Sequence, residues 1–389
     1  QAGGTPPVQE PAQPEKSVEP IEPEEFKQNA FPDKDINEKK NMEPAQDTAP
    51  ETGMDIRSRM EAARKREEEE NRRNQMAERK EQNEAMQQVE EDLGHVKKPA
   101  KVITVFSAKG GVGKTTIACE LATFLSLTNH GKGKFRVCLV DYDLMFGDIL
   151  STLNFNPNQA NMMDWIADLD KKHKAGQEWN AISYDAGQIE RFLQKKEESG
   201  LYSLIAPITN FDYMKISNEE IVNLCGTMLR NIVENGDFDF VIVDTGNNIE
   251  DATYVSLERA DEILLILRQS MNSANCNNNF LNTMNHLEFD LSKIRIVINK
   301  AKPAKGVGIS VNELQEALKN PVTNQPFECY AKIKDNDAVQ NAENIGEPMV
   351  YKSSHEFTKS IGEVAHHVIG DMFVLAKPKK KRFSFFRKK

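Results

Sequence analysis

Cysteine is scarce in this chain of 389 residues, which has only five of them. They are scattered and include no Cys-x-x-Cys pair, so the sequence offers neither a disulfide framework nor a paired-cysteine metal site. The five positions are Cys119, Cys138, Cys225, Cys276 and Cys329. This usage is typical of a protein that works in a reducing compartment.

Long apolar runs are also missing, because no stretch approaches the roughly 20 residues that a membrane-spanning helix needs. The first ten residues, QAGGTPPVQE, have no basic-then-apolar pattern, so we expect no signal peptide. The net charge of −10 argues against a protein that coats nucleic acid with its whole surface. Together these features predict a cytoplasmic protein.

The composition divides the chain into segments. Residues 1–53 are rich in proline and glutamate and poor in large apolar side chains, which predicts disorder. Residues 54–95 contain Ala, Glu, Lys, Arg and Gln with acid–base pairs at helical spacing, which predicts a charged helix. Its apolar positions hold no heptad register, so a solvated single helix is favoured over a coiled coil.

Residues 101–375 carry the pattern of an α/β domain. Short apolar runs alternate with helical stretches such as 115–127, 217–234 and 354–375. The runs lie at 102–106, 137–140, 202–206, 240–243, 262–267 and 294–298. Strands buried on both faces look like this, so we predict a doubly wound, mostly parallel sheet with helices on both faces.

The strongest chemical signal is SAKGGVGKTT, which runs from Ser107 to Thr116 between a strand and a helix. Glycines let the backbone N–H groups approach a polyphosphate, and a lysine and a hydroxyl at its end contact the phosphates and Mg²⁺. We therefore predict a P-loop with Lys114 on the β- and γ-phosphates and Thr115 on Mg²⁺. The predicted nucleotide-binding positions are Gly110, Gly111, Val112, Gly113, Lys114, Thr115 and Thr116.

The additional lysine, Lys109, makes KGGVGKTT resemble the deviant Walker A box of the ParA/MinD superfamily. That resemblance implies a Mg²⁺-dependent ATPase in which Lys109 reaches the nucleotide of a second subunit. It also implies that ATP binding produces a homodimer.

Further motifs carry the same resemblance across residues 101–375. It implies that Asp143 activates the attacking water, that Asp141 and Asp244 support Mg²⁺, and that Asn299 contacts adenine. The segment 333–348 resembles the loop and helix around the base, which makes Lys334 a candidate for nucleotide binding. Asp141 and Asp143 have a plainer interpretation too, as caps of the loop that follows them.

The base is predicted from one missing carboxylate. Asn299 and Lys300 begin like the guanine-reading motif Asn-Lys-x-Asp, but its fourth position holds Lys302. Without an acid to read guanine, adenine is favoured.

Two segments resemble the CpaE/TadZ branch, whose members position pilus and secretion machinery. They are DYDLMFGDI with its continuation, and GISVNELQEALKNPV. Many members of that branch carry a receiver-like domain in their N-terminal part, where we expect a disordered segment and a charged helix in this sequence.

The segment 376–389 is basic and aromatic, with eight Lys or Arg, three Phe and no acid. We expect Lys377–Lys389 to bind an anionic membrane at its inner face, where cations and aromatic rings act together. A solvated basic end or a nucleic-acid arm remains an alternative.

Two functions stay open from the sequence. One is a dimerising ATPase switch that positions a membrane-associated pilus, secretion or conjugation machine. The other is a ParA-type DNA-partitioning ATPase. An iron–sulfur or nickel assembly factor is disfavoured by the lack of paired cysteines, and a tyrosine kinase by the lack of tyrosine after Tyr351.

Overall fold

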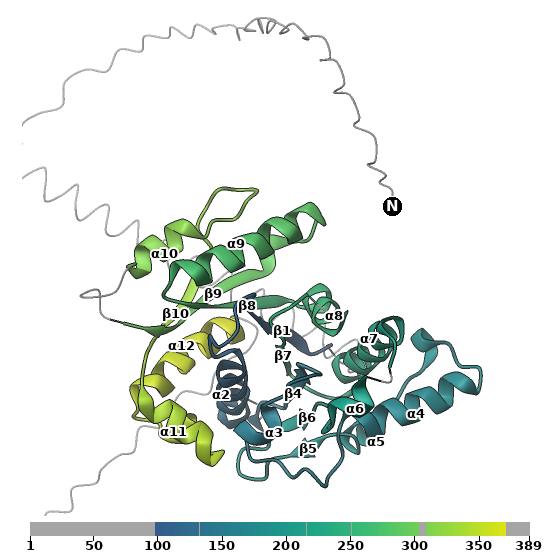
Figure 1. The fold of residues 1–389 in the computed structure, drawn as a ribbon. Coiled ribbons are helices and arrows are strands. Elements are labelled where there is room, and N and C mark those ends of the chain that lie inside the picture. The colour runs from purple at the N-terminus through teal and green to yellow at the C-terminus, as the bar shows by residue number, and fades with distance from the viewer. Residues whose placement is uncertain (1–97, 132, 215, 250, 303–308, 371–389) are drawn as a thin grey trace, which may run out of the picture. The chain divides into compact units, whose positions relative to one another are not determined.

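The computed structural model describes residues 98–131, 133–214, 216–249, 251–302 and 309–370. These residues form an eight-stranded sheet in the order β10-β9-β8-β1-β7-β4-β6-β5, with a separate β2-β3 hairpin (Figure 1). The strands are β1 (Lys101–Phe106), β2 (Asn129–His130), β3 (Gly133–Lys134), β4 (Val137–Tyr142), β5 (Gln194–Lys195), β6 (Tyr202–Leu204), β7 (Phe240–Thr245), β8 (Glu262–Arg268), β9 (Ile294–Ala301) and β10 (Cys329–Lys334). All pairs in the large sheet are parallel except β5 with β6.

Helices cover both faces of this sheet, as Figure 1 shows. They are α2 (Lys114–Leu127), α3 (Ile149–Thr152), α4 (Met162–Lys174), α5 (Ala186–Glu190), α6 (Asn210–Tyr213), α7 (Asn218–Asn235), α8 (Asp251–Arg259), α9 (Met271–His286), α10 (Val311–Ala317), α11 (Asp337–Ile345) and α12 (Glu356–Ile369). Three 3-10 turns, η1 (Trp179–Ala181), η2 (Leu291–Lys293) and η3 (Met349–Tyr351), complete the elements.

The two faces of β1 explain the continuous apolar runs. Ile103 and Val105 belong to the core under α2 and α12, whereas Val102 and Phe106 join the cores on the opposite face. Because both faces are buried, alternation with polar residues is absent. The predicted α/β fold with a mostly parallel sheet is confirmed.

All six predicted strands are present, and three further elements escaped the sequence analysis. β10 is only partly buried, β5 has two residues, and the β2-β3 hairpin is largely exposed, so none has a strong apolar pattern. The last predicted helix ends at Ile369. The predicted disordered segment 1–53, the charged helix 54–95 and the basic tail 376–389 lie outside the described residues.

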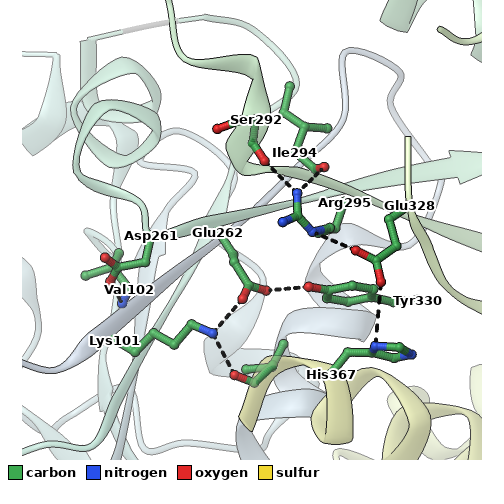
Figure 2. Close-up of polar contacts among 11 residues, drawn as sticks. Lys101, Val102, Asp261, Glu262, Ser292, Ile294, Arg295, Glu328, Tyr330 and His367 are labelled. Carbon is green, nitrogen blue, oxygen red and sulfur yellow. Dashed lines mark hydrogen bonds and ion pairs between the residues drawn. The ribbon is translucent and has the colours of Figure 1, made fainter. Parts of the chain in front are cut away.

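A polar network fixes the end of α12 beneath the amino ends of the strands (Figure 2). Lys101 Nζ donates to Val368 O over 2.7 Å and pairs with Glu262 over 2.5 Å. The Tyr330 hydroxyl donates to Glu262 over 3.1 Å, and its ring stacks on His367 with centroids 4.4 Å apart. These contacts join β1, β8, β10 and α12.

No helix among the described residues is long and apolar enough to cross a bilayer.

Candidate functional site

The carboxyl ends of the central strands carry the predicted site residues, because parallel strands all end at the same edge. β1 ends at Phe106, and the chain then forms a glycine-rich loop that leads into α2 at Lys114. Gly111 and Gly113 have φ values of 71° and 93°, in the left-handed region that favours glycine. A Cβ on Gly113 would stand 2.4 Å from Asn299 Nδ2, so a side chain at this position is also excluded by packing.

Two buried asparagines hold this loop from neighbouring strands and helices. Asn299, at the end of β9, donates from Nδ2 to Val112 O over 2.9 Å and accepts the Lys300 N–H at Oδ1 over 2.9 Å. Asn277 in α9 accepts the Ala108 N–H at Oδ1 over 3.1 Å. The sequence predicts Asn299 only as a base contact and gives no indication of Asn277. An asparagine-rich helix gives no signal of which amide turns inward.

Asp244, at the end of β7, is the most unusual group of the site. It is fully buried, and neither carboxylate oxygen has a hydrogen-bond partner within the described residues. Burial raises the pKa of its carboxyl, and the nearby Thr115 hydroxyl and Lys114 ammonium oppose that rise. A buried carboxylate without partners is costly, so the site favours a cation beside it.

Asp141, at the end of the adjacent β4, is equally buried. Burial, followed by the charge of Asp244, raises the pKa of its carboxyl. Its oxygens accept the N–H groups of Asp143 and Ile149, each over 3.3 Å. A Cβ on Gly147 would lie 2.6 Å from Asp141 Oδ2, which explains why glycine is needed in the loop that wraps this carboxylate.

Asp143 begins the loop that follows β4 and is partly exposed. Its Oδ1 accepts the Phe146 N–H over 3.2 Å, so it also shapes the loop, as the plainer interpretation held.

Lys109 is exposed on the P-loop. Its backbone N–H donates to Ser107 Oγ over 3.3 Å.

Two glutamates join the P-loop helix α2 to the late segment 333–348 and the residues just after it. Neither glutamate is a predicted site residue. The Thr116 hydroxyl donates to Glu343 of α11. One turn further along α2, buried Glu120 accepts the N–H groups of Met349 and Val350 over 2.7 and 2.9 Å. Glu343 therefore links α2 to α11, and Glu120 links α2 to the η3 turn between α11 and α12.

Lys334, the remaining predicted nucleotide contact, ends β10 at the same edge of the sheet. Its ammonium group pairs with Glu356 at the start of α12, and both side chains are exposed. The site thus brings together Lys114, Thr115, Asp141 and Asp244, with Lys334 further along the edge.

The chemistry of this donor set suits a hydrated magnesium ion bound together with phosphates. Mg²⁺ is usually held by one or two oxygen ligands from the protein plus water and substrate phosphates. The described residues contain no group of three or more His, Cys, Asp or Glu side chains arranged to hold a metal by themselves. The Thr115 hydroxyl and the Asp244 carboxylate fit the smaller protein share.

Comparison with known proteins agrees with this geometry. A family model described as AAA domain, AAA_31, matches residues 100–296, which is half of the chain. The septum site-determining protein MinD of Thermotoga maritima is 22% identical over 276 residues, covering 69% of this chain and 88% of that protein. MinD of Escherichia coli K12 is 23% identical over 287 residues, covering 70% and 92%.

Solved structures share the fold. A ParA family ATPase from Chlorobium tepidum aligns with a TM-score of 0.56 at 23% identity, covering 69% of this chain and 99% of that one. MinD of Pyrococcus horikoshii, complexed with Mg-ADP, aligns with a TM-score of 0.53 at 15% identity, covering 69% and 96%. The chain therefore belongs to the AAA_31 family of AAA domains and is a P-loop ATPase of the ParA/MinD superfamily.

Proposed function

We propose that this protein is a dimerising switch that binds ATP with Mg²⁺ and resets by hydrolysing it. The observation that carries the proposal is the buried Asp244 carboxylate, which has no hydrogen-bond partner among the described residues and lies beside Thr115 and Lys114. A divalent cation with phosphates would satisfy this buried carboxylate, which Thr115 and Lys114 compensate only in part.

Each residue of the site then has a task in phosphoryl transfer. The backbone N–H groups of residues 110–116 cradle the phosphates, and Lys114 neutralises charge on the β- and γ-phosphates. Bound Mg²⁺ would supply further neutralisation of the phosphate oxygens. Asp143 orients the attacking water, while Asp141 keeps the loop around it in place through its backbone contacts. Asn299 supports the loop through its contact with Val112 and would also contact the adenine.

Lys109 completes the site from the second subunit. It is exposed at the tip of the loop, so it is available to a nucleotide across an interface. A cation supplied in trans stabilises the charge that develops in the transition state, as an arginine finger does. Hydrolysis removes the γ-phosphate that both subunits share, so the dimer separates.

The switch is proposed to position a pilus, secretion or conjugation machine at the inner face of the cell membrane, as CpaE/TadZ proteins do. Its basic aromatic segment, Lys377–Lys389, would provide the membrane affinity. MinD relatives are named for determining the septum site, and a MinC:MinD complex of Aquifex aeolicus shares the fold with a TM-score of 0.54. These names favour a role in positioning.

A ParA-type DNA-partitioning ATPase is the second candidate. Arg268, Lys300 and Lys302 lie together at the carboxyl ends of β8 and β9, and their positive charges would suit DNA phosphates. Binding of duplex DNA in the presence of ATP, with a steep dependence on salt, would favour this candidate over the membrane role.

Sedimentation velocity and phosphate release test the switch itself. Wild type should dimerise with ATP and not with ADP, and its specific activity should rise with protein concentration. Lys109→Ala should retain ATP binding while losing dimer and turnover, and Asp143→Ala should accumulate the ATP-bound dimer. Lys171→Ala, an exposed lysine of α4, is the matched control. A Lys109→Ala protein that dimerises and turns over like wild type would contradict the proposal.

A further inference from the structure

A carboxylate from α11 binds the hydroxyl of a P-loop residue. Thr116 is the third residue of α2, in the first helical turn after Lys114, and its side chain donates to a carboxylate oxygen of Glu343. The two residues are 227 positions apart in the chain, and Figure 1 shows α11 close to α2. Thr116 is only 9% exposed, so bulk water is a poor substitute for this partner. The contact ties the first turn of the P-loop helix to α11.

The Thr116 hydroxyl has one proton to donate. It lies in the helical turn whose N–H groups face the phosphates of a nucleotide, because phosphates bind at the amino end of a helix. A phosphate oxygen beside this turn is an acceptor for the same proton that Glu343 binds. For this hydroxyl, the bond to Glu343 and a bond to phosphate are therefore alternatives.

Few buried side chains hold α11 against the rest of the domain. Of its nine residues, all of which the structure describes, Ala342 is buried, and Ala338 and Val339 are partly buried. Glu343 itself is partly exposed, so its carboxylate can turn into water when the Thr116 hydroxyl leaves it. An element with few buried contacts is one that rearranges at low cost. The bond to Glu343 can thus be exchanged without unfolding the domain.

We propose that Glu343 competes with bound phosphate for the Thr116 hydroxyl and thereby weakens nucleotide binding, including the binding of the product ADP. The inference rests on the proposed nucleotide site and names a residue that regulates it. Glu343 is a positioning residue, because it acts through Thr116. A hydrogen bond to a charged acceptor is stronger than one between neutral groups, so giving it up subtracts from the affinity for nucleotide. The same bond favours the release of ADP, which resets the site after hydrolysis.

Binding of a fluorescent ADP analogue in the presence of Mg²⁺ tests the competition. Glu343→Ala should bind the analogue about tenfold more tightly than wild type, because no bond to a charged acceptor has to be given up. The gain should appear mainly as slower dissociation. Glu347→Ala is the matched control, since Glu347 is an exposed glutamate that carries the same charge and lies just after α11. It should bind the analogue like wild type.

Variants of Thr116 decide whether the effect passes through the hydroxyl. In Thr116→Val, which has nearly the same shape but no hydroxyl, adding Glu343→Ala should leave the affinity for the analogue unchanged. In Thr116→Ser, which retains a hydroxyl, adding Glu343→Ala should tighten binding as it does in wild type. Thermal unfolding of each variant verifies that it is folded at the temperature of the binding measurement.

The competition and the nucleotide site fail in different ways. If Glu343→Ala binds the analogue like wild type or more weakly, the contact only fastens α11 to α2, and the competition is wrong while the nucleotide site stands. A gain of the same size in Thr116→Val would show that Glu343 acts by its charge alone, which also overturns the competition. If wild type binds neither ADP nor ATP, both the nucleotide site and the competition are wrong.

Discussion

We expect the buried carboxyl of Glu120 to make the fold lose stability as the pH rises from 4.5 to about 7. Glu120 lies in α2 and is 4% exposed, and its oxygens accept the N–H groups of Met349 and Val350. Burial raises the pKa of this carboxyl from 4.5 to about 7, although the two backbone donors lower it. The folded chain therefore retains a proton that the unfolded chain releases within this pH range.

The size of the effect follows from the pKa. One pKa unit corresponds to about 1.4 kcal/mol, so the rise to about 7 corresponds to about 3 kcal/mol of unfolding free energy. Stability falls with rising pH wherever the folded state binds more protons than the unfolded state. The loss therefore grows as the pH rises to about 7 and stays constant at higher pH. For a domain of this size, about 3 kcal/mol shifts the thermal midpoint by about 6–12 °C.

Glu120→Gln keeps the volume of the side chain and removes its titration. Thermal unfolding of both proteins at pH 5 and pH 8 should show that the unfolding free energy of the variant falls by about 2.5 kcal/mol less than that of wild type over this change, because a small part of the effect lies below pH 5. Comparing differences removes the contribution of every other titrating group. Glu363→Gln, an exposed glutamate of α12, should retain the wild-type difference. If Glu120→Gln retains it as well, the carboxyl is not held protonated and the reasoning is refuted.

Three further outcomes are expected. Lys114→Ala should abolish binding of a fluorescent ATP analogue, because it removes the charge that faces the β- and γ-phosphates. ATP should outcompete GTP for the site, since the position two residues after Lys300 holds Lys302 where guanine readers have an acid; equal affinities would defeat this expectation. Changing the three phenylalanines of Lys377–Lys389 to serine should strongly reduce co-sedimentation with anionic liposomes, because apolar insertion is lost. Liposome binding that is unchanged but competed by duplex DNA would identify a nucleic-acid arm.

The fold could be predicted to a large extent because its central strands are buried on both faces. Ile103, Ile242 and Leu265 belong to apolar runs whose burial leaves a pattern in the sequence. The P-loop could be predicted because its glycines and Lys114 are required by backbone geometry and charge, independently of other parts of the chain. β10 escaped because it is only partly buried and lies at the edge of the sheet.

The supporting contacts of the site could not be predicted, because they join residues far apart in the chain. Asn277 braces Ala108 across 169 positions, and Glu343 meets Thr116 across 227. Nothing in the local sequence distinguishes these two side chains from exposed neighbours of the same type. Only the packing of α9 and α11 against the P-loop reveals them.

The most direct test of the central claim is phosphate release from a mixture of Lys109→Ala and Lys114→Ala proteins. The first binds ATP but offers no lysine to its partner, and the second offers Lys109 but binds no ATP. The account predicts that each is inactive alone and that mixing restores hydrolysis, because the mixed dimer contains one complete site. A mixture as inactive as its separate components would contradict a lysine supplied across a dimer interface.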